Sequence, residues 1–377
     1  MTPLSRHLLL SVLLAILLAP AAPGQEALDY RKIKRGRWKS QHVPPGFFVH
    51  RYKRYQFQSN WDEKVVSRLA RHMNLMFKVY WKLSPPRKTP TDLLVIKLFR
   101  TRKQFLAYGG SPGAAAYYSG RDKEMVGYNT GKVGGISTIE GTTGGGLRGR
   151  LARANSMDVL GVFSHEGWHQ YFHWACGSKI PFPSWLDEGI GDYFYTAYPG
   201  KDGKIVLGAP MDGRLRTIQR AIRRKRHVPL EKIVWFEQAD YYRNPGQNYA
   251  QGWSMVHFFM EHPHYKKKRI VQRFLKVFID QHSIKRTIPK IFPRKTKWDV
   301  MERDWEEWVL SMPLEVDPDD PLAERTEEAN KEARKHFEAL PPDVRKALMV
   351  CLRKRAERPG SPAPLPDWIL ASPPAGK

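Results

Sequence analysis

The chain has only two cysteines, Cys176 and Cys351, in 377 residues, and their spacing matches no metal-binding pattern. This excludes a small fold held together by disulfides, and we expect both cysteines to be buried free thiols. After the first 24 residues no apolar run is long enough to cross a membrane. Hydrophobic residues still make up 41% of the chain, which is enough to form a sizeable core and excludes wholesale disorder.

Acidic residues are also scarce, because 37 Asp and Glu stand against 63 Lys and Arg and leave a formal net charge of +26. A charge of this size indicates an anionic counterpart or a cationic surface that maintains solubility. Nucleic acid is one counterpart of that kind, but the N-terminus argues against it. We expect acidic glycans, anionic lipid headgroups, acidic peptides or another acidic surface as counterparts of this charge, and no nucleic acid.

Residues 1–24 have the features of an export signal. Arg6 precedes the apolar run Leu8–Ala19, and small residues follow as far as Gly24. The run is too short to span a bilayer comfortably, which favours cleavage after Ala21 or Gly24 over a retained anchor helix. The sequence therefore predicts a periplasmic or secreted protein without a transmembrane segment in its mature form.

The order of elements in the mature chain predicts an α+β protein in which a small sheet precedes a mainly helical remainder. We expect extended chain at 47–58, followed by a helix that is capped by Ser59 or Asn60 and ends at Ser84. A strand at 93–99 and a short helix with a capping box of Thr101 and Gln104 come next. A hairpin over 114–129 completes this part of the chain. Later apolar stripes predict a helical hairpin between 322 and 352.

The predicted divisions follow these elements. They are a signal at 1–24, a basic flexible arm at 25–45, an N-terminal α+β subdomain at 46–157, a helical subdomain at 158–312, a helical extension at 313–358 and a disordered tail at 359–377. A glycine-rich loop occupies 131–149. It lacks both the Gly-x-Gly-x-x-Gly pattern and the Gly-Lys-Ser/Thr pattern, so it does not predict a nucleotide-binding loop.

The residues with evident chemistry lie on a predicted helix over 158–177. His165 and His169 are four positions apart, so their imidazoles leave the same face of the helix one turn apart. This geometry suits two ligands of a tetrahedral Zn²⁺ ion. Glu166 follows the first histidine, where its carboxylate can face a water molecule instead of the metal, as in the His-Glu-x-x-His pattern of zinc peptidases.

A second predicted helix, at 183–194, supplies a carboxylate. Glu188 lies 19 positions after His169, and it can complete a His, His, Glu ligand set that leaves the fourth position for water. We therefore expect one Zn²⁺ per chain. His173 lies a further turn along the first helix, too far to join the same ion, and we expect it on the surface or beside the ligands.

These motifs resemble those of the gluzincin metallopeptidases. The matching pieces are His165-Glu-Gly-Trp-His169, a gap of eighteen residues, and Glu188 within Trp-Leu-Asp-Glu-Gly-Ile-Gly-Asp-Tyr-Phe. The second string is similar to the peptidase MA-like group, which includes exported bacterial domains of unassigned substrate. The resemblance covers about residues 45–312 and implies a zincin-like fold with an active-site cleft between an N-terminal sheet subdomain and a helical subdomain.

The resemblance also implies two supporting residues. Thermolysin-type gluzincins place an aspartate four residues after the glutamate ligand to orient a ligand histidine, and Asp192 occupies that place. Aminopeptidase-type gluzincins take a tyrosine that stabilises the transition state from a Tyr-x-Lys-Gly segment. Tyr249 matches that tyrosine, although Gln251 replaces the lysine. Tyr241, Tyr242 and His257 are the alternatives.

Two related classes fit less well. Metzincins require glycine and histidine at the positions of Phe172 and Ala175. The Gly-x-Met-Glu-Asn element with which aminopeptidases hold the substrate amine is absent, and the nearest string, Gly113-Ala-Ala-Ala116, has no glutamate. This favours an endopeptidase over an aminopeptidase.

The sequence thus predicts an exported zinc metallopeptidase with Glu166 as general base and Tyr249 as a donor to the oxyanion. The resemblance to gluzincins also implies that an extended peptide or protein substrate would pair with an edge strand of the 114–129 hairpin. The alternative is a catalytically silent protein on a zincin scaffold that binds anionic polymers or cell-surface glycans. The presence of Glu166 argues against it, because a structural zinc site needs no base.

Overall fold

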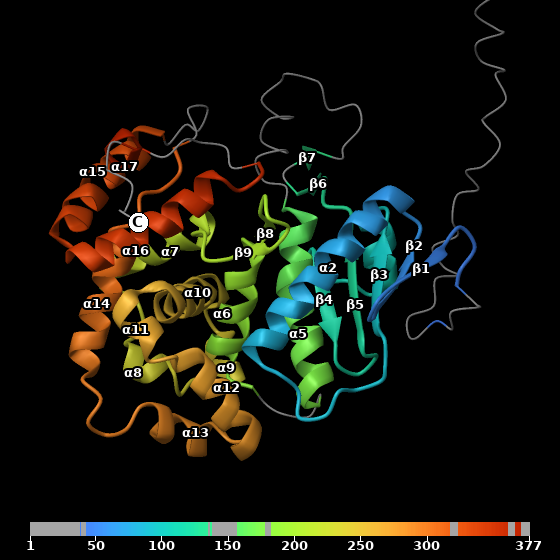
Figure 1. Cartoon of the computed structure of the whole chain (residues 1–377), viewed down its shortest axis with the longest axis horizontal. Coiled ribbons are helices and arrows are strands. Elements are labelled where there is room, and N and C mark those ends of the chain that lie inside the picture. The colour runs from blue at the N-terminus through green and yellow to red at the C-terminus, as the bar shows by residue number, and fades with distance from the viewer. Residues whose placement is uncertain are drawn as a thin grey trace, which may run out of the picture.

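The computed structural model describes residues 38, 43–134, 136–137, 157–177, 182–316, 323–360 and 366–370. The predicted signal, most of the predicted basic arm and most of the glycine-rich loop lie outside these residues. The fold is α+β, as predicted: a mixed sheet near the N-terminus is followed by a mostly helical region (Figure 1).

The main sheet has five strands in the order β1-β2-β3-β5-β4. Its strands are β1 (Phe48–Tyr52), β2 (Tyr55–Ser59), β3 (Leu94–Phe99), β4 (Ala116–Ser119) and β5 (Glu124–Tyr128). The β2–β3 and β3–β5 pairs are parallel, whereas β1–β2 and β4–β5 are antiparallel. The extended chain predicted at 47–58 is therefore two strands, because the chain turns at Lys53, whose φ is 53°. The β4 strand lies at an edge of this sheet.

Two helices accompany the sheet, α2 (Glu63–Leu83) and α3 (Arg102–Tyr108). Asp62 caps α2 by accepting a hydrogen bond from the Val65 amide at 3.0 Å, so the cap predicted at Ser59 or Asn60 is wrong. Both of those side chains are already engaged by the strand β3 and its end: the Ser59 hydroxyl donates to the Leu98 carbonyl, and the Asn60 amide oxygen accepts from the Arg100 amide. The predicted capping box of α3 is present.

The helices α5 (Val159–Cys176) and α6 (Ser184–Tyr195) lie between the sheet and the remaining helices (Figure 1). Asp158 caps α5, and α6 packs against α10 (Pro245–Glu261). A Cβ atom at Gly189 would lie 2.5 Å from the carbonyl oxygen of Gly252 in α10. Only glycine allows α6 and α10 to approach this closely, and the approach brings the residue before Gly189, the predicted ligand Glu188, close to α10.

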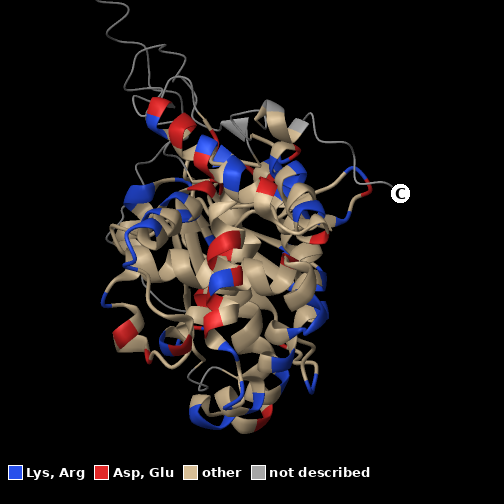
Figure 2. Ribbon diagram, turned by 90° about the vertical axis from the view of Figure 1, so that its left-hand side faces the viewer, with Lys and Arg blue, Asp and Glu red and all other residues tan. Residues whose placement is uncertain are grey.

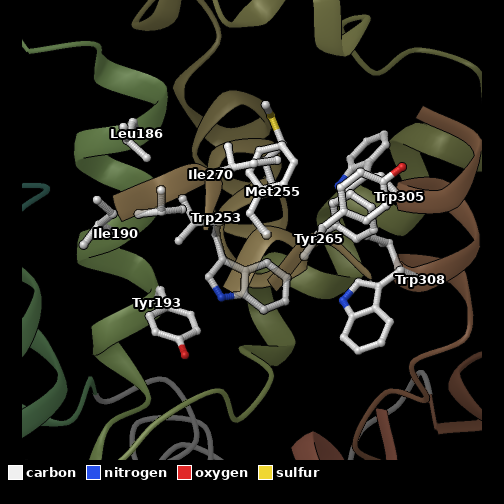
Figure 3. Close-up of a cluster of buried hydrophobic side chains, with 14 of the residues drawn as sticks. Leu186, Ile190, Tyr193, Trp253, Met255, Tyr265, Ile270, Trp305 and Trp308 are labelled. Atoms are coloured by element: carbon white, nitrogen blue, oxygen red, sulfur yellow. The ribbon is translucent and has the colours of Figure 1, made fainter. Parts of the chain in front are cut away.

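A short ribbon of β6 (Lys132–Val133) and β7 (Ile136–Ser137) follows β5. The other elements of the helical region are α7 (Asp212–Arg223), α8 (Leu230–Ile233), α9 (Gln238–Tyr241), α11 (Pro263–Lys267), α12 (Ile270–Gln281), α13 (Ile284–Ile291), α14 (Trp298–Leu310), α15 (Ala323–Ala339), α16 (Pro342–Ala356) and α17 (Asp367–Leu370), with the short ribbon of β8 (Tyr198–Pro199) and β9 (Ile205–Val206). Their core is rich in aromatic side chains, and Trp253, Trp305 and Trp308 are fully buried in it (Figure 3). Because α6 and α10 pack into this core, their positions relative to each other are fixed.

The C-terminal helices α15 and α16 form the predicted helical hairpin, which packs on the helical region. The buried Arg355 of α16 pairs with Asp212 at 2.9 Å and donates to the Pro313 carbonyl at 2.7 Å. Beyond it, residues 366–370 include α17, within a stretch for which the sequence predicted no fixed structure. Its Trp368 packs edge-on against Phe337, and Ile369 is buried, so apolar burial orders this short helix.

Both cysteines are free thiols; Cys351 is buried, whereas Cys176 is only half-buried. Among the described residues, no helix combines the length and the apolar character needed to cross a membrane.

Candidate metal centre

A cleft between the sheet and the helices brings the predicted site residues together. It has a volume of about 740 Å³. Residues 114–118, which lead into and form β4, line one side. His165, Glu166 and His169 reach it from α5, and Glu188 and Asp192 reach it from α6. The second helix therefore contributes its carboxylates to the same cavity as the two histidines, as the sequence predicted.

Three ligand-type atoms converge in this cleft. His165 Nε2 lies 3.1 Å from His169 Nε2 and 3.1 Å from Glu188 Oε2. His169 Nε2 lies 3.4 Å from the same Glu188 oxygen. Ligands that bind zinc tetrahedrally at 2.0–2.1 Å are separated from one another by roughly 3.3 Å. The two imidazoles and the carboxylate therefore have the spacing and the chemistry of a zinc ligand set.

The other nitrogen of each imidazole faces a carboxylate. His165 Nδ1 lies 3.0 Å from Asp192 Oδ1, which is the role that the resemblance implied for Asp192. His169 Nδ1 lies 3.0 Å from Asp187 Oδ1. A proton on each Nδ1 satisfies these carboxylates and leaves a lone pair on each Nε2. Two Nε2 lone pairs and a carboxylate oxygen then point at one another, which is repulsive without a cation between them.

The centre also stabilises positive charge on the histidines themselves. Burial alone would lower the pKa of His165, but its hydrogen bonds to Asp192 and Glu188 raise that pKa to about 10. Burial likewise opposes the charging of His169, and the carboxylates of Asp187 and Glu188 raise its pKa. The surroundings therefore favour a cation at this point, whether a proton or a metal ion.

Sequence reasoning did not identify Asp187 as a site residue. Its Oδ1 atom accepts hydrogen bonds from both His169 Nδ1 and the Trp168 indole, each at 3.0 Å, so it fixes the orientation of the His169 imidazole. The sequence feature that could have indicated Asp187 is its position immediately before the predicted ligand Glu188.

Arg214, on α7, is a second residue that the sequence did not single out. Its Nε atom donates to Asp192 Oδ2 at 2.7 Å, and its guanidinium lies 4.8 Å from the centre of the Tyr249 ring. The contact fixes the carboxylate that orients His165. No local pattern signals it, because the packing of α7 against α10 brings Arg214 into the cleft.

Glu166 lies in the cleft but outside the ligand cluster. Burial raises the pKa of its carboxyl group, while the nearby His165 and His169 act in the opposite direction. The backbone of Tyr118 in β4 hydrogen-bonds this carboxyl group. The contact shows that β4 turns its outer edge, opposite β5, toward Glu166. A carboxyl group with a raised pKa beside the ligands is suited to accept and return a proton.

Tyr249 also lines the cleft, as predicted, although it lies inside α10, which begins four residues earlier at Pro245. Its hydroxyl group hydrogen-bonds Glu188 and Tyr242. Tyr242, one of the alternatives, donates a hydrogen bond to Glu188 Oε1 and is 39% exposed. Both phenols therefore lie beside the ligand set, where burial and Glu188 raise their pKa values. Both stay protonated at neutral pH and can donate hydrogen bonds.

The other two alternatives have structural roles. The Tyr241 hydroxyl is buried and donates to the Asn248 carbonyl at 2.9 Å. His257 is fully buried in the helical core, where it bonds the Gly208 carbonyl and the Trp308 indole. Neither side chain lines the cleft. His173, by contrast, lines the cleft beside the ligands and stacks edge-on against Tyr118 at 5.1 Å.

Within the described residues, one other histidine and carboxylate group has its ligand-type atoms within reach of one ion: His227, Glu302 and Glu306. His227 Nε2 lies 2.8 Å from Glu302 Oε1 and 3.3 Å from Glu306 Oε1. The shorter separation is a hydrogen-bond distance, below the spacing of zinc ligands. We assign this group as a hydrogen-bonded contact between α14 and the segment before α8.

Comparison with known proteins adds a family of unknown activity. Residues 160–276 match the family described as protein of unknown function (DUF1570). No curated protein matches the chain. The matched region begins in α5 and ends in α12, so it contains every side chain of the candidate centre named above from His165 to Tyr249.

Proposed function

We propose that the protein is an exported zinc-dependent metallopeptidase of the gluzincin type that binds one zinc ion per chain. The observation that carries the proposal is the convergence of His165 Nε2, His169 Nε2 and Glu188 Oε2, with separations of 3.1–3.4 Å, in a cleft that also holds Glu166. The export is inferred from the signal-like residues 1–24 alone.

The side chains have distinct tasks in this proposal. Bound zinc would supply Lewis acidity that polarises the substrate carbonyl and lowers the pKa of water. Glu166 accepts a proton from the attacking water on its carboxylate and delivers it to the nitrogen of the breaking C–N bond, so that the amine leaves neutral. The Tyr249 hydroxyl donates a hydrogen bond to the oxygen that gains negative charge. Asp187, Asp192 and Arg214 keep the histidine ligands oriented.

The edge strand favours an extended peptide as substrate. The outer edge of β4 faces the cleft, and an extended chain can add to such an edge through backbone hydrogen bonds. The small side chains of Ala114 and Ala115 before β4 and of Ala116 at its start leave room for substrate side chains of different sizes. This supports hydrolysis of peptide bonds within a longer chain.

The carboxylates of the cleft also favour an endopeptidase over an aminopeptidase. Asp187 is engaged by His169 and Trp168, and Asp192 by His165 and Arg214. The remaining two, Glu166 and Glu188, have the tasks of base and ligand. Among the described residues of the cleft, no carboxylate is left to bind the ammonium group of a substrate N-terminus.

The decisive experiment compares the wild-type protein with Glu166→Gln. We expect about one zinc per chain in both proteins by elemental analysis, because Glu166 is not a ligand. Hydrolysis of a mixed peptide library should fall by about 10²–10⁴-fold or more in the variant, because the general base is lost. A Glu166→Gln protein as active as the wild type would contradict the mechanism. A wild-type protein that binds zinc but cleaves no peptide would favour the silent, polymer-binding alternative.

A further inference from the structure

The surface formed by α11, α12, α13 and the turn after α13, residues 266–297, carries an unusual charge; we call it the basic face. It has twelve Lys and Arg residues and a single acidic residue, Asp280. Six of the basic residues lie in or between α11 and α12: Lys266, Lys267, Lys268, Arg269, Arg273 and Lys276. The other six lie in and after α13: Lys285, Arg286, Lys290, Arg294, Lys295 and Lys297. All twelve side chains are exposed.

These cations have few carboxylate partners. Lys266 lies 3.5 Å from Glu261, and across the described ranges none of the other eleven forms an ion pair. The one acidic residue, Asp280, forms an ion pair with Arg87 from the loop before β3. Arg87 thereby adds a further cation beside the face. Like charges that are not paired repel one another in the folded protein. Most of the charge of the basic face is therefore not neutralised by carboxylates of the described structure and can attract an external anion.

The two longer helices of the basic face present their cations as one surface. In α12, Phe274 and Phe278 are fully buried, whereas Arg273 and Lys276 point outward. The Arg273 guanidinium reaches the Lys290 carbonyl at the end of α13, at 3.5 Å, so the helices lie side by side. An α-helix of the length of α12 spans roughly 18 Å. Lys and Arg prevail over Asp and Glu at the lower end of the molecule, where α12 and α13 lie (Figure 2).

We propose that the basic face is a binding surface for a linear anionic polysaccharide, sulfated or carboxylated, separate from the metal centre. None of its residues lines the cleft, so a polymer can occupy it while the cleft remains free. Several cations spread over about two nanometres match a chain of regularly repeated negative groups better than a single small anion.

The composition of the basic face favours a polysaccharide over the other polyanions. The large exposed apolar side chains of the described structure are Leu93, Met157, Trp235, Tyr242 and Val350, and none of them belongs to this face. It therefore offers neither apolar groups to enter a membrane interface nor exposed aromatic rings on which nucleic acid bases would stack. Attraction by charge remains, and the predicted export places the protein among acidic glycans.

The test measures binding of labelled dextran sulfate and labelled alginate to the zinc-loaded protein over a range of salt concentrations. The face variant combines Arg273→Gln, Lys276→Gln, Lys285→Gln and Arg286→Gln. The matched control combines Lys64→Gln, Arg68→Gln, Arg71→Gln and Lys78→Gln on α2, which removes the same charge from exposed positions. Dextran sulfate and alginate distinguish a preference for sulfate from one for carboxylate.

We expect the face variant to lose about tenfold or more in affinity and to show a slope of log Kd against log salt that is smaller by about 3 to 4. The control should change affinity by about twofold at most. Equal losses in both variants, or no binding of either polysaccharide, would overturn the proposal. Tighter binding of anionic vesicles or duplex DNA in the same salt would reassign the face to a membrane or to nucleic acid.

The inference does not rest on the proposed peptidase activity. Zinc content should be the same in the face variant, the control and the wild type, and any cleavage of a neutral peptide should be unchanged. Loss of zinc from the face variant would show that the substitutions disturb the fold and would contradict a surface that acts separately from the cleft.

Discussion

Two clusters of largely buried polar side chains in this molecule differ in how their atoms face one another. Under α3, the Lys97 ammonium donates to Tyr108 and to Glu124, and the Tyr108 hydroxyl donates to the second oxygen of Glu124. Each of these contacts joins a donor to an acceptor. In the cleft, once the Nδ1 atoms of His165 and His169 carry the protons that face Asp192 and Asp187, both Nε2 atoms and Glu188 Oε2 face one another as acceptors.

We infer from this difference that the first cluster is structural and that the second is the proposed metal site. The Lys97–Glu124 pair is neutral as a whole and satisfied by protein atoms, so folding alone accounts for it. The cleft cluster is satisfied only when a cation enters it, and its outer carboxylates, Asp187 and Asp192, stabilise that cation. The same residue types thus indicate either structure or function, and the direction of their hydrogen bonds distinguishes the two.

The largest expected effect is the response of the cleft cluster to removal of metal. A ligand present at 1,000 times its Kd stabilises the folded state by about 4 kcal/mol. Chelation should therefore lower the free energy of unfolding of the zinc-loaded wild type by about that amount, and His169→Ala should abolish the response together with the bound zinc. Urea denaturation with and without chelator, combined with elemental analysis, measures both. If His169→Ala binds as much zinc as the wild type, the ligand assignment is wrong.

Breaking the sheet cluster should affect stability without affecting zinc. Lys97→Met leaves the Glu124 carboxylate buried without its cation, which should cost about 3–5 kcal/mol in the free energy of unfolding. The double variant Lys97→Met, Glu124→Leu removes both charges and should recover much of that loss.

In both of these variants the zinc content per folded chain should stay at the wild-type value. A parallel loss of zinc would mean that the two clusters are energetically coupled and do not act independently.

The sequence could predict features that depend on local spacing. It predicted His165, His169 and Glu188 because helical spacing fixes the relation of the two histidines and a second predicted helix carries the glutamate. The capping box of Thr101 could be predicted for the same local reason. The α2 cap could not, because Ser59 and Asn60 form hydrogen bonds with β3 and its end, about forty residues away.

Arg214 and the edge position of β4 depend on packing between segments distant in sequence. Arg214 reaches Asp192 because α7 packs against α10, and β4 faces the cleft because the sheet places it at the edge beside β5. No local pattern encodes either relation, so the surroundings of the ligands required the structure.

A third buried group, His257, allows a pH test of a satisfied cluster. It accepts a hydrogen bond from the Trp308 indole and donates one to the Gly208 carbonyl, so it is held neutral. Burial lowers its pKa from 6.5 to about 4. The unfolded chain then binds the proton more readily, so stability should fall as the pH drops below 6.5 and level off below about 4. The loss from this group alone should approach about 3 kcal/mol.

His257→Gln provides the comparison for that test, because an amide can accept and donate in the same two directions without titrating. Urea denaturation of both proteins should be run at several pH values between 7 and 4 in the presence of chelator, which removes any contribution from metal. The wild type should lose more stability than the variant. Identical pH dependence in the two proteins would contradict the assignment of His257 as a buried neutral group.

The smallest expected effect concerns Asp187, the carboxylate behind the second ligand. Asp187→Asn keeps an oxygen near His169 Nδ1 and the Trp168 indole but removes the charge that makes the imidazole a stronger ligand. We expect zinc affinity to fall by about 10- to 100-fold, measured by competition with a chelator of known affinity, while the free energy of unfolding in chelator changes little. Asp202→Asn, at an exposed loop carboxylate that pairs with Lys204, is the control and should leave zinc affinity unchanged. A structural role for Asp187 would instead lower stability in chelator and leave the affinity of the folded protein for zinc intact. The two readouts therefore decide whether this carboxylate belongs with the satisfied clusters or with the metal centre.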